Sequence, residues 1–304
     1  MHSQACLAIE KGFHMLTHIA WCNETGNPFR VWRGAERGWH CEKVSPGCAN
    51  CYAETRNLSQ RCGLGTGLPY ARASRKGLVA ELDNDLLSLW RNARVPKLWF
   101  VSSMTDVFLD FWSDEFRDQL FDAMEASCHT FLVLTKHIGR ARDYLKERWD
   151  CRRRSPAPNI WLGVSIEDTK RAEERLPLLF ATPAAHRFIS YEPALELVDW
   201  NEHLNYCSAE GTHSAAVDWL IVGLESGPRA RWPRDDIGQL AASSLVAQTI
   251  RQCHDLAIPC FVKQLGSRWA KARHAKDRKG ADPSEWPADL RVHQFPPALA
   301  KVKR

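Results

Sequence analysis

The sequence predicts an α/β fold in which parallel strands form a partial or closed (β/α) barrel. Short apolar runs rich in β-branched and aromatic residues recur from residue 98 onward. Most of these runs start roughly 30 residues apart, the size of a βαβ unit. Amphipathic stretches with helical spacing lie between them. A doubly wound sheet, built from the same units, is the alternative.

Each apolar run is nearly continuous, as expected for strands of a parallel sheet that is covered on both faces. The predicted strands span residues 98–101, 130–134, 160–164, 187–190, 219–222 and 260–262. A further candidate strand, residues 16–21, precedes a cysteine-containing loop and brings the number to seven. Seven strands of the βα type favour the barrel.

Helices are expected where apolar residues recur at helical spacing. The expected helices span residues 52–61, 114–126, 139–149, 169–180 and 237–256. Ser113 is a plausible N-cap, because Asp114 and Glu115 follow it in the first turn. Residues 201–216 are polar and irregular, which indicates an inserted surface loop. We expect a barrel domain over residues 1–265 and a basic extension over 266–304, packed on the barrel or covering it.

The composition is that of an ordinary soluble globular chain. The 304 residues are 44% hydrophobic and 25% charged, with a formal net charge of +5. No apolar stretch approaches the ~18–20 residues of a membrane span, and the N-terminus does not read as a secretory signal. We therefore expect a cytoplasmic protein, in the host cytoplasm if a phage encodes it, with no membrane partner.

Polar and ionisable residues directly follow the predicted strands. In barrels and open α/β sheets, chemistry collects at the carboxyl ends of the strands. Helix capping explains Asp168, but Glu and Lys are poor caps and are costly beside apolar strands unless they are paired. The residues singled out at this predicted functional rim are Ser102, Ser103, Asp106, Lys136, Ser165, Glu167, Tyr191, Glu192, Glu225 and Lys263.

Three of the 11 cysteines, Cys41, Cys48 and Cys51, lie together in one loop with a Pro46-Gly47 turn. The other eight are scattered, and we expect most of them to pack as small hydrophobic residues. Three close thiols suit either a structural zinc, with His40 or Cys62 as fourth ligand, or a [4Fe–4S] cluster with one open iron. Because the loop follows the first predicted strand, the metal would lie at the mouth of the barrel.

Motifs along nearly the whole chain resemble those of one family. The loop reads Cys41-Glu42-Lys43-Val44-Ser45-Pro46-Gly47-Cys48-Ala49-Asn50-Cys51-Tyr52, and further matches lie at residues 17–28, 103–108, 134–136, 161–168, 192–193, 222–228, 261–264 and 277–283. This pattern resembles a phage and bacterial three-cysteine-motif family of formerly unknown function. That family is similar to the radical S-adenosylmethionine (SAM) enzymes, as a divergent branch related to the spore photoproduct lyases.

The sequence also departs from the usual pattern of those enzymes. Its cysteine spacing is C-x6-C-x2-C, where most radical SAM enzymes have C-x3-C-x2-C. Asn50 replaces the usual aromatic residue before the third cysteine, and Ala20 and Gly26 replace a Glu and a Trp of the family pattern. About nine extra residues, roughly 30–38, precede Cys41. None of these changes removes a thiolate.

The resemblance implies a mechanism and roles for the singled-out residues. Cys41, Cys48 and Cys51 would ligate the [4Fe–4S] cluster, and SAM on the open iron would be cleaved to a 5′-deoxyadenosyl radical that abstracts a hydrogen atom. A flavodoxin or ferredoxin would supply the electron. The implied cofactor-binding residues are Tyr52, Ser102, Ser103, Asp106, Ser165 and Glu167. The implied catalytic residues are Lys136, Tyr191, Glu192, Glu225 and Lys263, and either Tyr191 or one of the remaining cysteines would relay a hydrogen atom.

The substrate prediction uses both charge and resemblance. The Arg152-Arg153-Arg154 run and the basic tail suit phosphate contacts. We predict an isomerase- or lyase-type rearrangement of a nucleobase adduct in DNA, as in phage hypermodification. The alternatives are a photoproduct-lyase-like repair enzyme, a nuclease or hydrolase with divalent ions on Asp106, Glu167, Glu192 and Glu225 and a structural zinc, and a non-catalytic zinc protein that binds nucleic acid.

Overall fold

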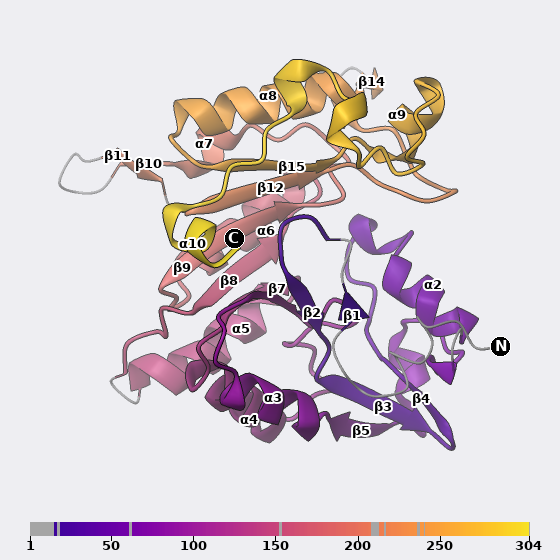
Figure 1. Ribbon diagram of the computed structural model, residues 1–304, viewed down its shortest axis with the longest axis vertical. Helices are drawn as coiled ribbons and strands as arrows, with labels where there is room; N and C mark the ends of the chain where they lie inside the picture. The colour runs from indigo at the N-terminus through magenta and orange to yellow at the C-terminus, as the bar shows by residue number, and fades with distance from the viewer. Residues whose placement is uncertain are drawn as a thin grey trace. The chain divides into compact units, whose positions relative to one another are not determined.

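The structure is a computed structural model that describes residues 15–16, 19–60, 63–151, 154–207, 213–215, 217–235, 238–239 and 241–303 (Figure 1). The chain divides into two compact units. Unit 1 comprises residues 1–162, 183–185 and 301–304, and unit 2 comprises residues 163–182 and 186–300. Strand β8 (Ile160–Ser165) contributes its first half to unit 1 and its second half to unit 2.

The predicted fold class is confirmed: the protein is α/β, with seven parallel strands in a curled sheet of the half-barrel type. These strands are β2 (Glu24–Gly26), β6 (Leu98–Val101), β7 (Thr130–Thr135), β8, β9 (His186–Tyr191), β12 (Trp219–Gly223) and β15 (Cys260–Gln264). All residues of β6, β8 and β12 are buried, which explains why these strands are visible as continuous apolar runs in the sequence.

In unit 1 the strand order is β1-β2-β6-β7-β8, and the short β1 (Met15–Leu16) pairs antiparallel with β2. Of the predicted strand over residues 16–21, Leu16 lies in β1 and residues 17–18 lie outside the described part. The prediction is wrong for residues 19–21, which form a turn in which Cys22 N–H donates to Ile19 O. The parallel pairing of the first strand, β2, with β6 starts only at Glu24. It starts there because the preceding residue, Asn23, already bonds β6 through both its backbone and its side chain. Asn23 N donates to Leu98 O (2.8 Å) and its Oδ1 accepts from Leu98 N (2.9 Å).

The helices of unit 1 are α2 (Tyr52–Ser59), α3 (Asn84–Asn92), α4 (Asp114–Glu125) and α5 (Ile138–Leu145). The predicted cap of α4 is confirmed, since Ser113 Oγ accepts from Phe116 N at 3.3 Å. The helix predicted over residues 139–149 is regular only to Leu145, after which Lys146–Cys151 form a π-helical segment.

The extra residues before the cysteine loop form a hairpin of β3 (Phe29–Arg33) and β4 (Glu36–Gly38). With β5 (Val79–Leu82) they make a separate antiparallel sheet in the order β4-β3-β5. Gly34 adopts φ 59° at the turn, a conformation that glycine tolerates best. Phe29 and Val31 are fully buried, so the hairpin has one face in the core of unit 1.

In unit 2 the strand order is β8-β9-β12-β15, with helices α6 (Thr169–Phe180), α7 (Trp200–Leu204) and α8 (Ala242–Asp255). Asp168 caps α6 by accepting from Arg171 N at 2.9 Å. The predicted start of α8 at residue 237 is wrong, because a hairpin of β13 (Arg234–Asp235) and β14 (Gly238–Gln239) precedes it. Within residues 201–216, an expected irregular loop, the structure describes the rest of α7 and a hairpin of β10 (Asn205–Cys207) and β11 (His213–Ala215).

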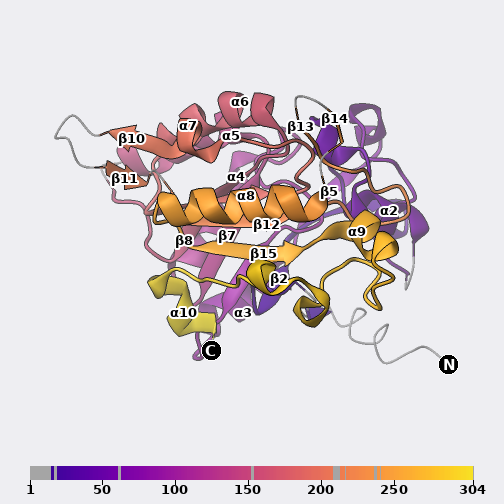
Figure 2. The same ribbon diagram turned by 90° about the horizontal axis from the view of Figure 1, so that it is seen from above.

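The C-terminal extension contains α9 (Gly266–Ala272), two 3-10 turns (Pro283–Glu285 and Ala288–Leu290) and α10 (Pro297–Lys303). Residues 266–300 belong to unit 2, where α9 follows the end of β15 (Figure 2). Val262 N donates to Val292 O (2.8 Å), and the rings of Phe261 and His293 stack at 4.3 Å. Trp286 is 2% exposed, so this segment is part of the core of unit 2.

No helix among these described residues combines the length and the apolar character that a membrane span requires.

Candidate metal and cofactor site

The cysteine loop, residues 40–52, connects β4 to α2 in unit 1. A 3-10 turn at Pro46–Cys48 folds it back, with Cys48 N donating to Ser45 O at 3.0 Å. Cys41 and Cys51 pack on a buried cluster, which we call the apolar cluster and which consists of Trp39, Ala53, Tyr70 and Met104. All three loop cysteines are free thiols. The loop therefore places the thiols of Cys41 and Cys51 on an apolar surface, with Cys48 near enough to act on both electrostatically.

The loop thiols lie close enough to act on one another electrostatically. Burial raises the pKa of Cys41, and the neighbouring charges of Asp106, Cys51 and Cys48 raise it further. Burial also raises the pKa of Cys51, opposed by hydrogen bonds from the backbone of Glu54 and Ala53 at the start of α2. The raised pKa favours the neutral thiol at Cys41 and at Cys51, and a bound metal is the kind of cation that makes such thiols ionise.

Four side chains, which we call the latch, tie the cysteine loop and its neighbours to the loop after β6. Tyr52 Oη donates to Ser103 O (2.7 Å), and Tyr70 Oη donates to Met104 O (2.7 Å). Thr105 Oγ1 donates to His40 O (2.5 Å). Asn27 bonds Ser103 Oγ (3.2 Å) and accepts from Met104 N (2.8 Å). The latch, which consists of Tyr52, Tyr70, Thr105 and Asn27, thus fixes the loop after β6 against the cysteine loop.

Ser102 is the most strained residue in this region. It has φ 59°, in the left-handed region that non-glycine residues rarely adopt, and it is 4% exposed. Its N–H donates to Gly26 O at 2.7 Å, while its buried hydroxyl has no hydrogen-bond partner among the described residues. A strained backbone with an unsatisfied hydroxyl is typical of ligand-binding positions.

Asp106 joins the loops that follow β6 and β7. Its Oδ1 accepts from Thr135 Oγ1 (2.7 Å) and Phe108 N (2.9 Å), and its Oδ2 accepts from Lys136 N (2.8 Å). The structure therefore brings together two predicted site residues, Asp106 and Lys136, within unit 1. The carboxylate orients the strand-end backbone as well as contributing negative charge near Cys41.

In unit 2 the predicted acidic residues pair with different cations. Glu192 forms an ion pair with Lys263 at 2.7 Å, so these two predicted residues meet. Glu167 is fully buried and pairs with Arg175 at 2.8 Å. Glu225 accepts from Arg231 at both the backbone N (2.8 Å) and Nε (2.9 Å). Arg175 also donates to the backbone O of the predicted Ser165, at 2.6 Å.

Tyr191 lies in the core of unit 2. Its side chain is fully buried, its ring packs edge-on against Trp200, and its hydroxyl donates to Glu196 O. Because side chains alternate along a strand, Ser190 and Glu192 share the other face, where Ser190 Oγ lies 3.3 Å from Glu192 Oε2. The Tyr191 hydroxyl therefore does not lie beside Glu192. The predicted catalytic role of Tyr191 in one site with Glu192 would require the two groups to be neighbours.

Comparison with known proteins places this arrangement in a family. Residues 16–292 match the family described as "Protein of unknown function (DUF5131)". The chain belongs to this family. No curated protein and no solved structure matched. The DUF5131 region begins at β1 and includes the cysteine loop, the latch and all seven parallel strands.

The DUF5131 chain has no preassembled ion-binding group of three or more His, Cys, Asp or Glu side chains in its described part. Of the two candidate fourth zinc ligands, Cys62 lies outside the described residues. His40 directs Nε2 toward Glu42 at 3.5 Å and packs its ring against Phe111. The glutamates considered for divalent ions each have their own cationic partner. The donor set that fits a metal best is therefore the three thiols.

Sequence reasoning missed several residues that support the site in this DUF5131 protein. Asn57 uses all four hydrogen-bonding positions of its amide, on Trp39 N, Thr66 N, Thr66 Oγ1 and Leu68 O, at 2.9–3.2 Å. It thereby holds α2 against the residue two positions before Cys41. The sequence indicates Asn27 only as one position of the motif over residues 17–28. Three further residues lie outside every predicted strand end: Tyr70, Arg175 and Arg231.

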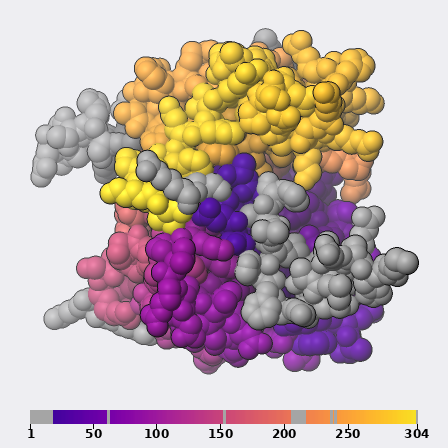
Figure 3. Space-filling view, in the orientation of Figure 1, coloured from indigo at the N-terminus to yellow at the C-terminus, as the bar shows by residue number. Residues whose placement is uncertain are grey.

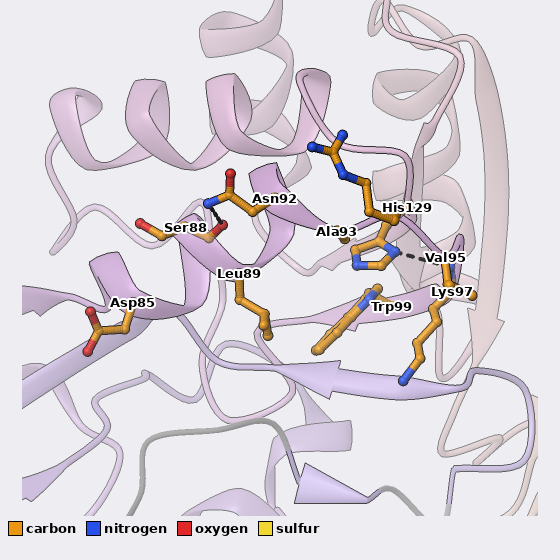
Figure 4. Close-up of a pocket in the computed structure, with 10 residues that line it drawn as sticks. Asp85, Ser88, Leu89, Asn92, Ala93, Val95, Lys97, Trp99 and His129 are labelled. Atoms are coloured by element: carbon orange, nitrogen blue, oxygen red, sulfur yellow. Dashed lines mark hydrogen bonds between the residues drawn. The ribbon is translucent and has the colours of Figure 1, made fainter.

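A surface cavity of about 740 Å³ lies elsewhere in unit 1 of the DUF5131 protein, at the amino ends of β6 and β7 (Figure 4). Leu89, Lys97, Trp99 and His129 are among its lining residues. Lys97 N donates to His129 Nδ1 at 3.1 Å, and Lys97 Nζ pairs with Glu24 at 2.7 Å. No predicted site residue lines this cavity, and the cysteine loop is tied to the opposite end of β6.

Proposed function

We propose that this protein is a radical SAM enzyme in which Cys41, Cys48 and Cys51 hold a [4Fe–4S] cluster. The observation that carries the proposal is the latch, because it fixes the three-thiol loop against the loop at the carboxyl end of β6. Catalytic and cofactor-binding groups of α/β proteins gather at that end of the strands.

The donor set fits the cluster in number and in chemistry. Thiolates are the usual ligands of iron–sulfur clusters, and three of them leave one iron open for a further ligand. The thiols of Cys41 and Cys51 are neutral while buried, so binding of the cluster would release protons. The described residues contain no preassembled group of three metal ligands, so cluster binding would draw the thiols of Cys41, Cys48 and Cys51 toward one another.

When bound, the cluster and SAM supply one-electron cleavage and hydrogen-atom abstraction. The chain's own residues bind, orient and exclude water. Trp39, Tyr70 and Met104 are buried beside the thiols and keep water from them. The unsatisfied Ser102 hydroxyl is available to a polar group of the cofactor, and Asp106 keeps the strand-end backbone in place.

The remaining rim residues are proposed to act on the substrate, which we propose to be a nucleobase adduct in DNA that undergoes rearrangement or isomerisation. Glu192 and Lys263 form an ion pair at 2.7 Å, and Lys136 stands directly after β7. Ser165 is the last residue of β8 and Glu167 follows the strand, and both are proposed to bind cofactor. A flavodoxin or ferredoxin in the cytoplasm would supply the electron.

Metal analysis of anaerobically purified protein tests the proposal. We expect a brown protein with about four iron and four acid-labile sulfide per chain. Cys48→Ala should remove the colour and the dithionite-dependent release of 5′-deoxyadenosine from SAM. Cys128→Ala is the matched control, because Cys128 is a free, exposed thiol outside the loop. A colourless chain that holds one zinc, or a Cys48→Ala variant that still forms 5′-deoxyadenosine, would refute the proposal.

A further inference from the structure

The positive charge of the chain is concentrated in its C-terminal extension. Residues 266–304 contain ten Lys and Arg against four Asp and Glu, whereas residues 1–265 contain 31 against 32. The excess is densest over residues 271–279, which we call the basic loop. Its cationic residues are Lys271, Arg273, Lys276, Arg278 and Lys279.

The five cations of the basic loop are all exposed, and none of them forms an ion pair within the described residues. The nearby acids bind backbone amides instead. Asp277 Oδ1 accepts from Lys279 N (2.6 Å), and the Glu285 carboxylate accepts from Lys276 N (2.7 Å) and Asp277 N (3.0 Å). The positive side chains therefore face solvent without an ion pair, and Asp282 acts electrostatically on one of them, Lys276.

The backbone of the basic loop is held on a fixed frame. Ser267 Oγ donates to Arg278 O at 2.8 Å. Gly280 O, at the end of the loop, accepts from Leu265 N (2.8 Å) and from Trp286 Nε1 (3.0 Å). A polyanion that binds here would have to order side chains but not backbone, which lowers the entropic cost of binding.

The basic loop belongs to the strand-end region of unit 2. Its first two residues are the last two of α9, and α9 itself begins shortly after β15 (Figure 2). Ser267 connects it to the loop after β12, because its N–H donates to Glu225 O (3.1 Å) and its Oγ accepts from Gly227 N (2.9 Å). The extension forms a broad area of the molecular surface (Figure 3).

We infer that the basic loop binds the phosphate backbone of the nucleic acid that carries the substrate base. The inference rests on the proposed function for the choice of a nucleic acid. Phosphate contacts require exposed Lys and Arg and little else. An acidic protein partner would require apolar anchor residues as well. The large exposed hydrophobic residues of the described chain, such as Val79 and Val95, all lie in unit 1.

Fluorescence anisotropy of the full chain with a labelled DNA duplex tests the inference. The test variant combines Arg273→Gln, Lys276→Gln and Arg278→Gln. The matched control combines Lys76→Gln, Arg94→Gln and Arg251→Gln, which are likewise two Arg and one Lys, exposed and without an ion pair in the described structure. The test variant should weaken binding on the order of tenfold per lost contact at 0.1 M salt, and should reduce the salt slope by about 3.

The control variant should bind as the parent does. The inference is overturned if the parent does not bind DNA at 50 mM salt, or if both variants lose affinity equally. It is also overturned if the test variant keeps the parental affinity and salt slope, or if polyglutamate competes as well as unlabelled DNA. Because this assay needs no cluster chemistry, its outcome is independent of the radical SAM assignment. In the test variant, iron content and thermal midpoint should equal those of the parent.

Discussion

Tyr70 and Tyr52 both donate a hydrogen bond to the loop after β6, but from different surroundings. Tyr70 is 3% exposed and Tyr52 is 59% exposed. The acceptor of Tyr70, Met104 O, belongs to a buried residue and would be left without a donor if the hydroxyl were removed. At Tyr52 water can replace the hydroxyl. Removing the hydroxyl therefore lowers the free energy of unfolding by different amounts at these two positions of the latch.

We predict that Tyr70→Phe lowers the free energy of unfolding by about 1–2 kcal/mol, because it leaves a buried carbonyl unsatisfied. Tyr52→Phe should lower it by about 0.5 kcal/mol or less. Urea denaturation of the two variants measures both values. Equal losses, or a larger loss for Tyr52→Phe, would show that the latch is not organised around Tyr70.

His129 gives unit 1 a pH dependence. Burial and the nearby Lys97 lower its pKa to about 4, while Glu24 acts in the opposite direction. The unfolded chain, with a pKa near 6.5, therefore binds more protons than the folded chain between these values. The stabilisation is complete above about pH 6.5 and is lost as the pH falls toward 4. His129→Gln should flatten the change in denaturation midpoint between pH 7 and pH 5; an unchanged slope would contradict this.

At the scale of elements, α2 is positioned by a single buried amide. Asn57 connects this helix to Trp39 at the end of the β3–β4 hairpin and to the segment after the helix. Its two donated bonds end on Thr66 Oγ1 and Leu68 O, and a carboxylate in place of the amide could donate to neither of them. The start of α2 also carries Cys51, so a shift of the helix moves a thiol.

We predict that Asn57→Asp destabilises the chain by about 2–4 kcal/mol and lowers its iron content after reconstitution. Asn92→Asp is the matched control, because Asn92 is exposed and donates only to Ser88 O. Chemical denaturation and iron analysis of both variants provide the two measurements. Wild-type stability in Asn57→Asp would mean that α2 is fixed by other contacts.

The elements differ in how much of them the sequence predicts. The strands β6, β7, β8, β9, β12 and β15 are visible because buried strands need continuous apolar runs. β2 carries Glu24, Thr25 and Gly26 and has no such run, so its pairing with β6 and with β1 makes it a strand. The β3–β4 hairpin was recognised as an insertion, but its pairing with β5, some fifty residues later, is a long-range contact without a local signal.

The residues of the candidate site also differ in whether the sequence predicts them. Strand ends could be found by position, and they include Asp106, Lys136, Glu192 and Lys263, which the structure brings together as two pairs. The partners Arg175 and Arg231 lie in a helix and a loop, where a charged residue is unremarkable until the fold is known. Tyr191 shows the limit of position alone, because the alternation of side chains turned it into the core.

At the scale of the whole molecule, the C-terminal extension supplies core residues as well as charge. Trp286, Leu290 and Leu299 are each 2% exposed or less. We predict that a chain ending at residue 265 fails to fold, because unit 2 would lose these residues and the hydrogen bond on Val262. A chain ending at residue 300 keeps all of them and is the control. Soluble expression and thermal unfolding of both chains measure the difference.

The latch also determines which positions are free to diverge. Three of its hydrogen bonds are donated by side-chain hydroxyls, those of Tyr52, Tyr70 and Thr105. The acceptors of these bonds are backbone carbonyl oxygens, those of Ser103, Met104 and His40. Every amino acid has such a carbonyl. Among relatives that keep this loop arrangement, positions 52, 70 and 105 should retain a hydroxyl, while substitutions at positions 40 and 104 leave these hydrogen bonds intact.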